Sequence, residues 1–150
     1  MDIERDALVD SARRWITLWQ GADLSGFDEL HAPDFVDHSA SGRRPDRAGF
    51  LAGIVELYRA FPDFNGTIED LVVDPASAKV AVRWTATGTH LGSFQGYPGT
   101  GARIRFVGIE IIRVPGGKVV ERWGEWDGLG ILEQLHVHAG SRKGCPQDTD

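Results

Sequence analysis

The chain has 150 residues and a mass of 16.4 kDa, which suits one domain with a single hydrophobic core. Its 41% hydrophobic and 25% charged residues are ordinary for a globular protein and argue against disorder. The net charge of -6 disfavours nucleic acids and acidic membrane surfaces as partners, because both attract basic proteins. The single cysteine, Cys145, cannot form an internal disulfide, and no secretory leader is evident, so we expect a cytoplasmic protein.

The first twenty residues predict an amphipathic helix. Asp2 is a candidate N-cap, and the apolar side chains that follow recur at helical spacing as far as about Gln20. Trp15 and Trp19 lie one turn apart on this apolar face. Such a pair can pack in the core or stack on a flat ligand, and both readings stay open.

Two more helices are expected before residue 62. A short one covers residues 27–31 and is stopped by Pro33, and a longer one runs from the N-cap Asp46 to about residue 61 with Tyr58 on its apolar stripe. Between them, residues 35–38 form a short strand or bend that ends at His38. A histidine that leaves an apolar segment for a polar loop can carry protons, or it can be structural.

From residue 66 the pattern changes to two β-hairpins. Residues 67–73 and 79–89 form the first hairpin, and alternation places Trp84 on its buried face. The glycine-rich loop 90–102 is too long for a hairpin turn and is typical of a lid or a site rim. Residues 103–114 and 118–127 form the second hairpin around a turn at Pro115, Gly116 and Gly117.

Three helices followed by an antiparallel sheet predict an α+β architecture, in which a curved sheet and its helices enclose an apolar cavity. Both faces of residues 103–114 are apolar, since Phe106 and Ile112 lie on one parity and Ile109 and Ile111 on the other. A second subunit would cover the outer face, so we expect a homodimer or homotetramer. The domain should span residues 1–135, and the polar tail 136–150 should be disordered.

Most classes of catalytic motif are missing from the sequence. It has no phosphate-binding glycine loop, no dinucleotide fingerprint and no nucleophile elbow. His136 and His138 have the spacing of a metal pair but lack a third ligand, so we expect no metal site. Cys145 lies in the same polar tail without a positioned base, so we expect no nucleophilic thiol. Acid and base chemistry by carboxylate and histidine in an apolar pocket remains.

Residues 85–135 resemble the SnoaL-like polyketide cyclases, also called ester cyclases, of the nuclear transport factor 2-like superfamily. The matching pieces are Gly88-Thr89-His90, Pro98-Gly99-Thr100-Gly101, Ile112-Arg113 before Gly117-Lys118, residues 123–127 and Gln134-Leu135, with a looser match at residues 35–38 and 60–63. The resemblance implies a cone-shaped α+β barrel, dimeric or tetrameric, that uses neither a metal nor an organic cofactor. In such cyclases an acidic residue removes a proton beside a carbonyl, and the enolate closes a ring by aldol addition.

Two positions depart from the family pattern. The catalytic aspartate of the cyclases falls at Gly124 of this chain, and their pocket histidine falls at Glu110. Glu110 shares a strand face with Ile104 and Phe106, so it can replace the missing base from the neighbouring strand. Asp127 also matches a family aspartate, although not the one credited with catalysis.

Two hypotheses follow. One is a cofactor-independent enzyme that acts on a small, hydrophobic, oxygen-bearing molecule, by cyclisation or another acid and base step such as isomerisation, hydrolysis or hydroxylation. Its candidate catalytic residues are Glu110, Asp127 and His38, whereas Glu121, Arg122 and Glu125 are expected at a solvated edge or in ion pairs. The other hypothesis is a noncatalytic binding or assembly module. In either case the candidate ligand-binding residues are Trp84, Trp123, Trp15, Trp19, Tyr58 and Phe106.

Overall fold

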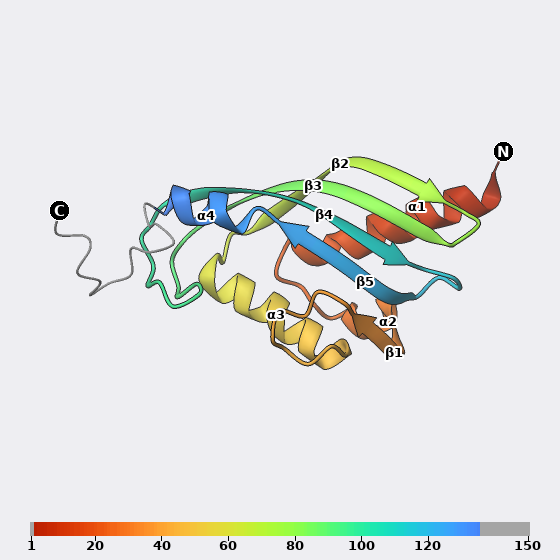
Figure 1. Cartoon of the computed structure of the whole chain (residues 1–150), viewed down its shortest axis with the longest axis horizontal. Helices are drawn as coiled ribbons and strands as arrows, with labels where there is room; N and C mark the ends of the chain where they lie inside the picture. The colour runs from red at the N-terminus through yellow and green to blue at the C-terminus, as the bar shows by residue number, and fades with distance from the viewer. Residues whose placement is uncertain (1, 136–150) are drawn as a thin grey trace.

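A curved five-stranded sheet organises the computed structural model, which describes residues 2–135, and helices lie along its concave face (Figure 1). The elements in chain order are α1 (Ile3–Ile16), a 3-10 turn (Thr17–Trp19), α2 (Phe27–Leu30), β1 (His31–Asp37), α3 (Arg47–Ala60), β2 (Asn65–Asp74), β3 (Lys79–Thr89), β4 (Arg103–Arg113), β5 (Val119–Trp126) and α4 (Gly128–Gln134). This arrangement confirms the predicted α+β class.

Both predicted hairpins are present, and they supply four of the five strands. The strand order is β1-β5-β4-β3-β2, and the pairs β2 with β3, β3 with β4 and β4 with β5 are antiparallel. The register places Glu110 of β4 opposite Val82 of β3 on one side and Gly124 of β5 on the other. Because side chains alternate along a strand, Glu110 faces the same way as the buried Ile104 and Phe106, as predicted.

The segment around His31 differs from the prediction. The short helix ends at Leu30, and residues 31–37 form the edge strand β1, which pairs with β5 in parallel rather than antiparallel orientation. Pro33 lies inside this strand instead of merely stopping a helix. An edge strand tolerates proline because the missing N–H can lie on the side that has no neighbour.

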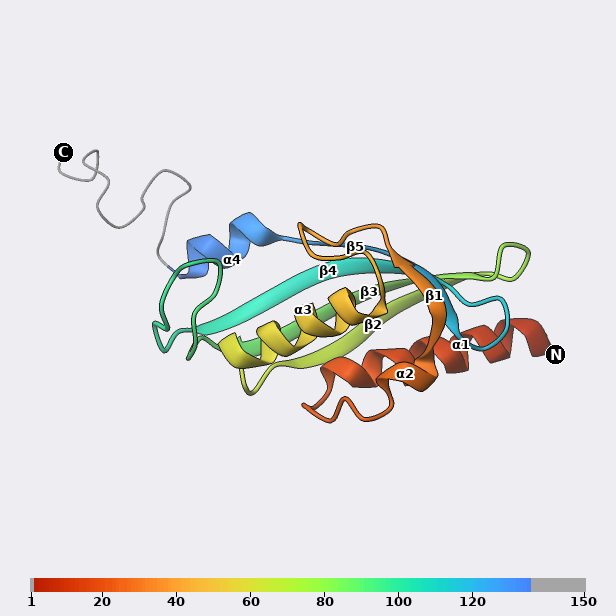
Figure 2. The ribbon, with the colours of Figure 1, turned by 90° about the horizontal axis from the view of Figure 1, so that it is seen from below.

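Two capped helices close the concave face of the sheet. The Asp2 side chain accepts a hydrogen bond from the Arg5 backbone N–H at 3.0 Å, and Asp46 accepts one from Gly49 at 2.8 Å, so both predicted N-caps are confirmed. Figure 2 shows α1 and α3 lying across the same face of the sheet. Their apolar faces join the inward-facing strand residues in one core, which includes Ala12, Phe50, Ile54, Val80, Val82 and Ile112.

The outer face of the sheet carries exposed apolar side chains on β4 and on the edge strand β2. Val72, Ile109 and Ile111 expose 68%, 52% and 37% of their surface, and no helix of residues 2–135 covers them. The homodimer or homotetramer expected from this face stays a prediction. In the described part of the chain, no helix is long and apolar enough to cross a membrane. The predicted tail, with His136, His138 and Cys145, lies outside the described residues.

Candidate functional site

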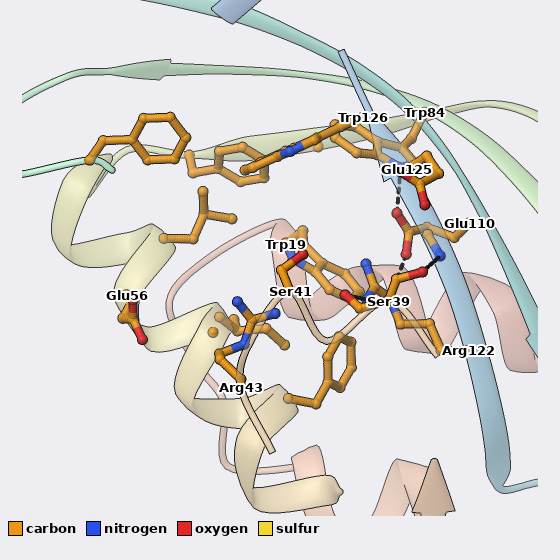
Figure 3. A pocket seen from close by; sticks show the side chains of 18 of the residues that line it. Trp19, Ser39, Ser41, Arg43, Glu56, Trp84, Glu110, Arg122, Glu125 and Trp126 are labelled. Atoms are coloured by element: carbon orange, nitrogen blue, oxygen red, sulfur yellow. Dashed lines mark hydrogen bonds and ion pairs between the residues drawn. The ribbon is translucent and has the colours of Figure 1, made fainter. Parts of the chain in front are cut away.

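A cavity of about 510 Å³ lies between the concave face of the sheet, α3 and the loop that follows β1 (Figure 3). Aromatic and aliphatic side chains form much of its wall, and they include Trp19, Phe50, Ile54, Leu57, Phe64, Trp84, Phe94 and Trp126. The polar side chains that line it include His38, Ser39, Ser41, Arg43, Glu56, Glu110 and Arg122. Ser93, Phe94 and Gln95 come from the loop 90–102, which therefore forms part of the cavity rim, as predicted.

Glu110 is the buried carboxylate of this cavity. Only 6% of the residue is exposed, and its two oxygens accept hydrogen bonds from different donors. Oε1 accepts from Nε of Arg122 at 2.7 Å, and Oε2 accepts from the indole N–H of Trp84 at 3.2 Å. Figure 3 shows these contacts on the sheet side of the cavity.

Burial raises the pKa of Glu110 above the ordinary value of a glutamate, because the charged form loses its hydration in the cavity wall. The positive charge and hydrogen bond of Arg122 and the hydrogen bond of Trp84 oppose this rise, whereas the negative charge of Asp37 adds to it. The net direction is upward, so Glu110 holds a proton more tightly than an exposed glutamate does. A carboxylate of this kind is a stronger base than usual.

Arg122 joins two buried carboxylates. Its Nη1 lies 2.8 Å from Oδ1 of Asp37, its Nε contacts Glu110, and its guanidinium carbon lies 4.9 Å from the ring centre of Phe50. The side chain of Asp37 is fully buried, and its Oδ2 has no hydrogen-bond partner among the described residues. The Glu110–Arg122–Asp37 cluster therefore carries two potential negative charges against one positive charge.

Gly124 leaves the space that this cluster fills. A Cβ atom at position 124 would lie 2.3 Å from Oε1 of Glu110 and 2.4 Å from Nη2 of Arg122, which is closer than real Cβ contacts. Since Glu110 and Gly124 are register partners, the carboxylate of the neighbouring strand occupies the volume of a side chain at 124. A side chain larger than glycine at position 124 would therefore require the Glu110–Arg122 pair to move.

Two predicted tryptophans, Trp84 and Trp19, line the cavity. Trp84 is 9% exposed, and its ring covers Gly108, where a Cβ atom would lie 2.4 Å from Cζ2 of the indole. Trp19 lies across the cavity from the sheet and packs edge-on against Trp15 at 4.6 Å between ring centres. Both indoles are available for contact with a flat ligand.

His38 lies at the cavity wall without a hydrogen bond to Glu110 in the described structure. Its Nε2 lies 2.9 Å from Oε2 of Glu121, and its ring stacks on Trp123 at 4.7 Å with an interplanar angle of 10°. The His38 side chain is 37% exposed. His38 and Glu110 thus both line the cavity, but Glu121 and Trp123, on the outer parity of β5, hold the imidazole away from the Glu110 carboxylate.

Trp15 and Tyr58 lie in the core and do not line the cavity. Trp15 is fully buried and donates its indole N–H to Nε2 of His31 at 3.0 Å. The Tyr58 hydroxyl bonds the backbone oxygens of Leu18 and Gly21 at 2.8 and 2.7 Å. Trp15 therefore packs in the core, which was one of the two alternatives for this residue, and is not placed to stack on a ligand in the cavity.

Phe106, Trp123 and Asp127 also lie away from the cavity. Phe106 is fully buried in the core, and Trp123 is on the outer parity of β5, where Lys79 lies 5.0 Å from its ring centre. Asp127 is exposed and caps α4, because its carboxylate accepts the Gly130 N–H at 2.9 Å. The structure does not bring Asp127 together with Glu110.

Sequence reasoning missed Ser39 and Arg43, which both line the cavity from the loop after β1. The Ser39 hydroxyl oxygen accepts the Gly124 N–H at 3.0 Å, which leaves its own hydrogen free to be donated. The Arg43 guanidinium lies against Gly53 of α3. The sequence signal was the polar loop 39–45 itself, which directly follows the strand that leads into the site.

The family comparison agrees with the fold. The model of the SnoaL-like polyketide cyclase family matches residues 9–135. IdmH from Streptomyces antibioticus, a candidate polyketide cyclase, is 32% identical with a TM-score of 0.76 over 87% of this chain and 99% of its own. AclR from Streptomyces galilaeus, a candidate hydroxylase, is 28% identical with a TM-score of 0.78 over 88% of this chain and 97% of its own.

A more distant structure shares the fold alone. TsrD from Streptomyces laurentii is 24% identical with a TM-score of 0.79 over 89% of this chain and 98% of its own. The search of curated proteins gave no match. The family match over residues 9–135, with structural neighbours along nearly their whole lengths, shows that this chain belongs to the SnoaL-like polyketide cyclase family.

Proposed function

We propose that this protein is a cofactor-independent acid–base catalyst, of the cyclase type, that acts on a small, hydrophobic, oxygen-bearing molecule in the cavity. The observation that carries the proposal is the Glu110 carboxylate, which is buried in the cavity wall with a raised pKa. A base whose pKa is closer to neutrality takes a proton from carbon more effectively than an exposed glutamate.

In the proposed reaction, Glu110 removes a proton from the carbon beside a substrate carbonyl, and the electron pair moves onto the carbonyl oxygen as an enolate. The enolate carbon then attacks a second carbonyl of the same molecule, which forms a carbon–carbon bond and leaves an alkoxide. Glu110 returns its proton to that alkoxide, so protons and charge balance. The nearest donors to this carboxylate are Nε of Arg122 at 2.7 Å and the N–H of Trp84 at 3.2 Å, and the hydroxyl hydrogen of Ser39 is a further donor in the cavity wall.

His38 keeps a secondary role in this proposal as a proton donor or relay at the cavity wall. Its ring stacks on Trp123 and its Nε2 contacts Glu121, both on the outer parity of β5, so this role requires the ring to turn from these partners toward the ligand. Asp127 caps α4, and that position supports no role in the reaction.

A noncatalytic binding module is the second candidate. The observation that favours it is that both oxygens of Glu110 already accept hydrogen bonds. Through Trp84 of β3 and Arg122 of β5, the carboxylate connects the two strands on either side of β4 and thus has a structural role. The two candidates differ in one property, which is whether Glu110 exchanges a proton with a bound ligand.

Exchange of α-protons tests this property without knowledge of the natural substrate. The flat ketone 2-tetralone would be incubated with the protein in D2O, and loss of its α-proton signals followed by NMR. We expect the wild-type protein to accelerate exchange and Glu110→Gln to abolish the acceleration. Glu69→Gln, which changes an exposed glutamate of β2, is the matched control and should exchange as the wild type does. Equal exchange by wild type and Glu110→Gln would refute the proposed base.

A further inference from the structure

Arg43 is a cation of the cavity that the reaction above does not use. We propose that the ligand carries an anionic oxygen group, such as a carboxylate, which the Arg43 guanidinium binds on the side of the cavity opposite Glu110. This inference rests on the proposed function in one respect, namely that the cavity holds a small molecule. It adds a substrate class, because the ligand must combine a flat apolar body with a negative charge.

The Arg43 side chain has no partner of its own within residues 2–135. It makes no ion pair and no side-chain hydrogen bond there, and its Nε is buried without an acceptor. Its neighbours in the sequence differ, since Arg44 lies 2.6 Å from Asp46 and Arg47 lies 3.7 Å from Asp28. A guanidinium offers five N–H donors, and leaving a buried donor unsatisfied is unfavourable. A ligand acceptor would satisfy it.

Gly53 makes room for this guanidinium. It lies inside α3, and a Cβ atom there would come within 2.6 Å of both Cζ and Nε of Arg43. Glycine inside a helix is unfavourable because it loses more backbone freedom on folding than alanine does. At this position the missing side chain lets Arg43 lie against the helix and still line the cavity.

The other arginine of the cavity cannot take this role as readily. Arg122 already contacts both Glu110 and Asp37, so its charge is compensated inside the wall. The two other carboxylates that line the cavity, Glu56 and Glu125, are exposed to solvent, where water screens them. Within residues 2–135, Arg43 is therefore the arginine of the cavity whose charge no carboxylate compensates.

The position of Arg43 also orients the ligand. Figure 3 shows Arg43 beside α3, with Glu110 and Arg122 across the cavity on the sheet side. An arginine binds a carboxylate through two parallel N–H donors, which fixes both distance and direction. A ligand held at Arg43 would extend its apolar body past Trp19 and Phe50 toward Glu110, and its negative charge would stay away from that carboxylate.

The test compares two flat probes that differ in charge, 2-naphthoate and 2-naphthamide, by calorimetric titration at pH 7. We expect the wild type to bind naphthoate roughly tenfold or more tightly than naphthamide, since hydrogen bonds to charged groups are the stronger ones. Arg43→Gln should remove this preference. Arg44→Gln, the exposed neighbour, should keep it. Equal affinities for the two probes, a preference that survives in Arg43→Gln, or no binding of naphthoate at millimolar concentration would each overturn the inference.

Two further variants separate this inference from folding and from catalysis. Gly53→Ala keeps the arginine and improves helix propensity, but its methyl group displaces the guanidinium; we expect unchanged or higher stability with a lost naphthoate preference. If Gly53→Ala still prefers naphthoate, Arg43 does not need the space that Gly53 leaves. Glu110→Gln should keep or increase the preference, because it removes a negative charge. If Glu110→Gln loses the α-proton exchange that the wild type shows but keeps the naphthoate preference, both proposals are confirmed. If the wild type itself catalyses no exchange but prefers naphthoate, only the catalytic proposal is refuted.

Discussion

Arg122→Met should destabilise the fold far more than a comparable change on the surface. The substitution removes the cation that contacts Glu110 at 2.7 Å and Asp37 at 2.8 Å, and it leaves two carboxylates buried without compensation. Removing one partner of a buried ion pair typically costs about 3–5 kcal/mol. Methionine keeps much of the aliphatic stem, so lost packing on Phe50 adds little.

Urea denaturation at pH 8 measures this cost. A loss of about 4 kcal/mol, with a slope near 2 kcal/mol per molar urea, shifts the midpoint by roughly 2 M. Arg83→Met is the matched control, because Arg83 lies 2.6 Å from Asp70 but both side chains are more than half exposed. Such surface pairs contribute about 0–1 kcal/mol.

The loss in Arg122→Met should shrink at pH 5. The folded-state pKa of Glu110 is raised by burial, and Arg122 opposes that rise, so the variant holds the proton more tightly still. An acid whose pKa is higher in the folded state stabilises the fold below its unfolded pKa of ~4.3 and loses that contribution as pH rises through the folded value. A loss below 1 kcal/mol at pH 8, or one that does not depend on pH, would refute the buried charge cluster.

Three other substitutions test individual positions. Gly124→Ala should cost about 1–3 kcal/mol in urea denaturation, because its Cβ would meet the Glu110–Arg122 pair, whereas Gly116→Ala in an open turn should stay within about 0.5 kcal/mol. Burial lowers the pKa of His31 from 6.5 to about 4, so the free energy of unfolding of the wild type should fall by about 3 kcal/mol as pH falls from 6.5 to 4. In His31→Gln the free energy of unfolding should depend less on pH over this range. The same pH dependence in the variant as in the wild type would contradict a buried, neutral His31. Asp127→Ala should lower the free energy of unfolding by about 1 kcal/mol, because α4 loses its N-cap, while α-proton exchange persists. Asp127→Ser, which keeps a capping oxygen, should recover most of that stability. Loss of exchange in Asp127→Ala would mean that Asp127 takes part in the reaction.

Local patterns in the sequence were sufficient to predict the elements that build the cavity. Turn residues such as Gly117 and the alternation of apolar side chains defined both hairpins, and parity alone placed Glu110 and Trp84 on the buried face. These features depend on neighbours within a few residues or on one antiparallel partner. For the same reason the N-caps Asp2 and Asp46 were predictable.

Features that depend on distant segments were not predictable. The parallel pairing of Val36 with Glu121 joins residues far apart in the sequence, and no local pattern encodes it. Arg122 was expected at a solvated edge or in an ion pair, and the ion pair is present, but its burial follows from the position of Asp37 on β1. Arg43 gives no periodic signal, because a loop positions it and the glycine that accommodates it lies in another element.

The most direct test of the central claim is the titration of Glu110 itself. The protein would be labelled with 13C at glutamate side-chain carboxyls, the Glu110 signal assigned by its absence in Glu110→Gln, and its shift followed with pH by NMR. If Glu110 is a buried base of the cavity, it should titrate clearly above the ~4.3 of an exposed glutamate. A midpoint at or below that value would mean that Arg122 dominates, and Glu110 would then be a structural anion rather than the base.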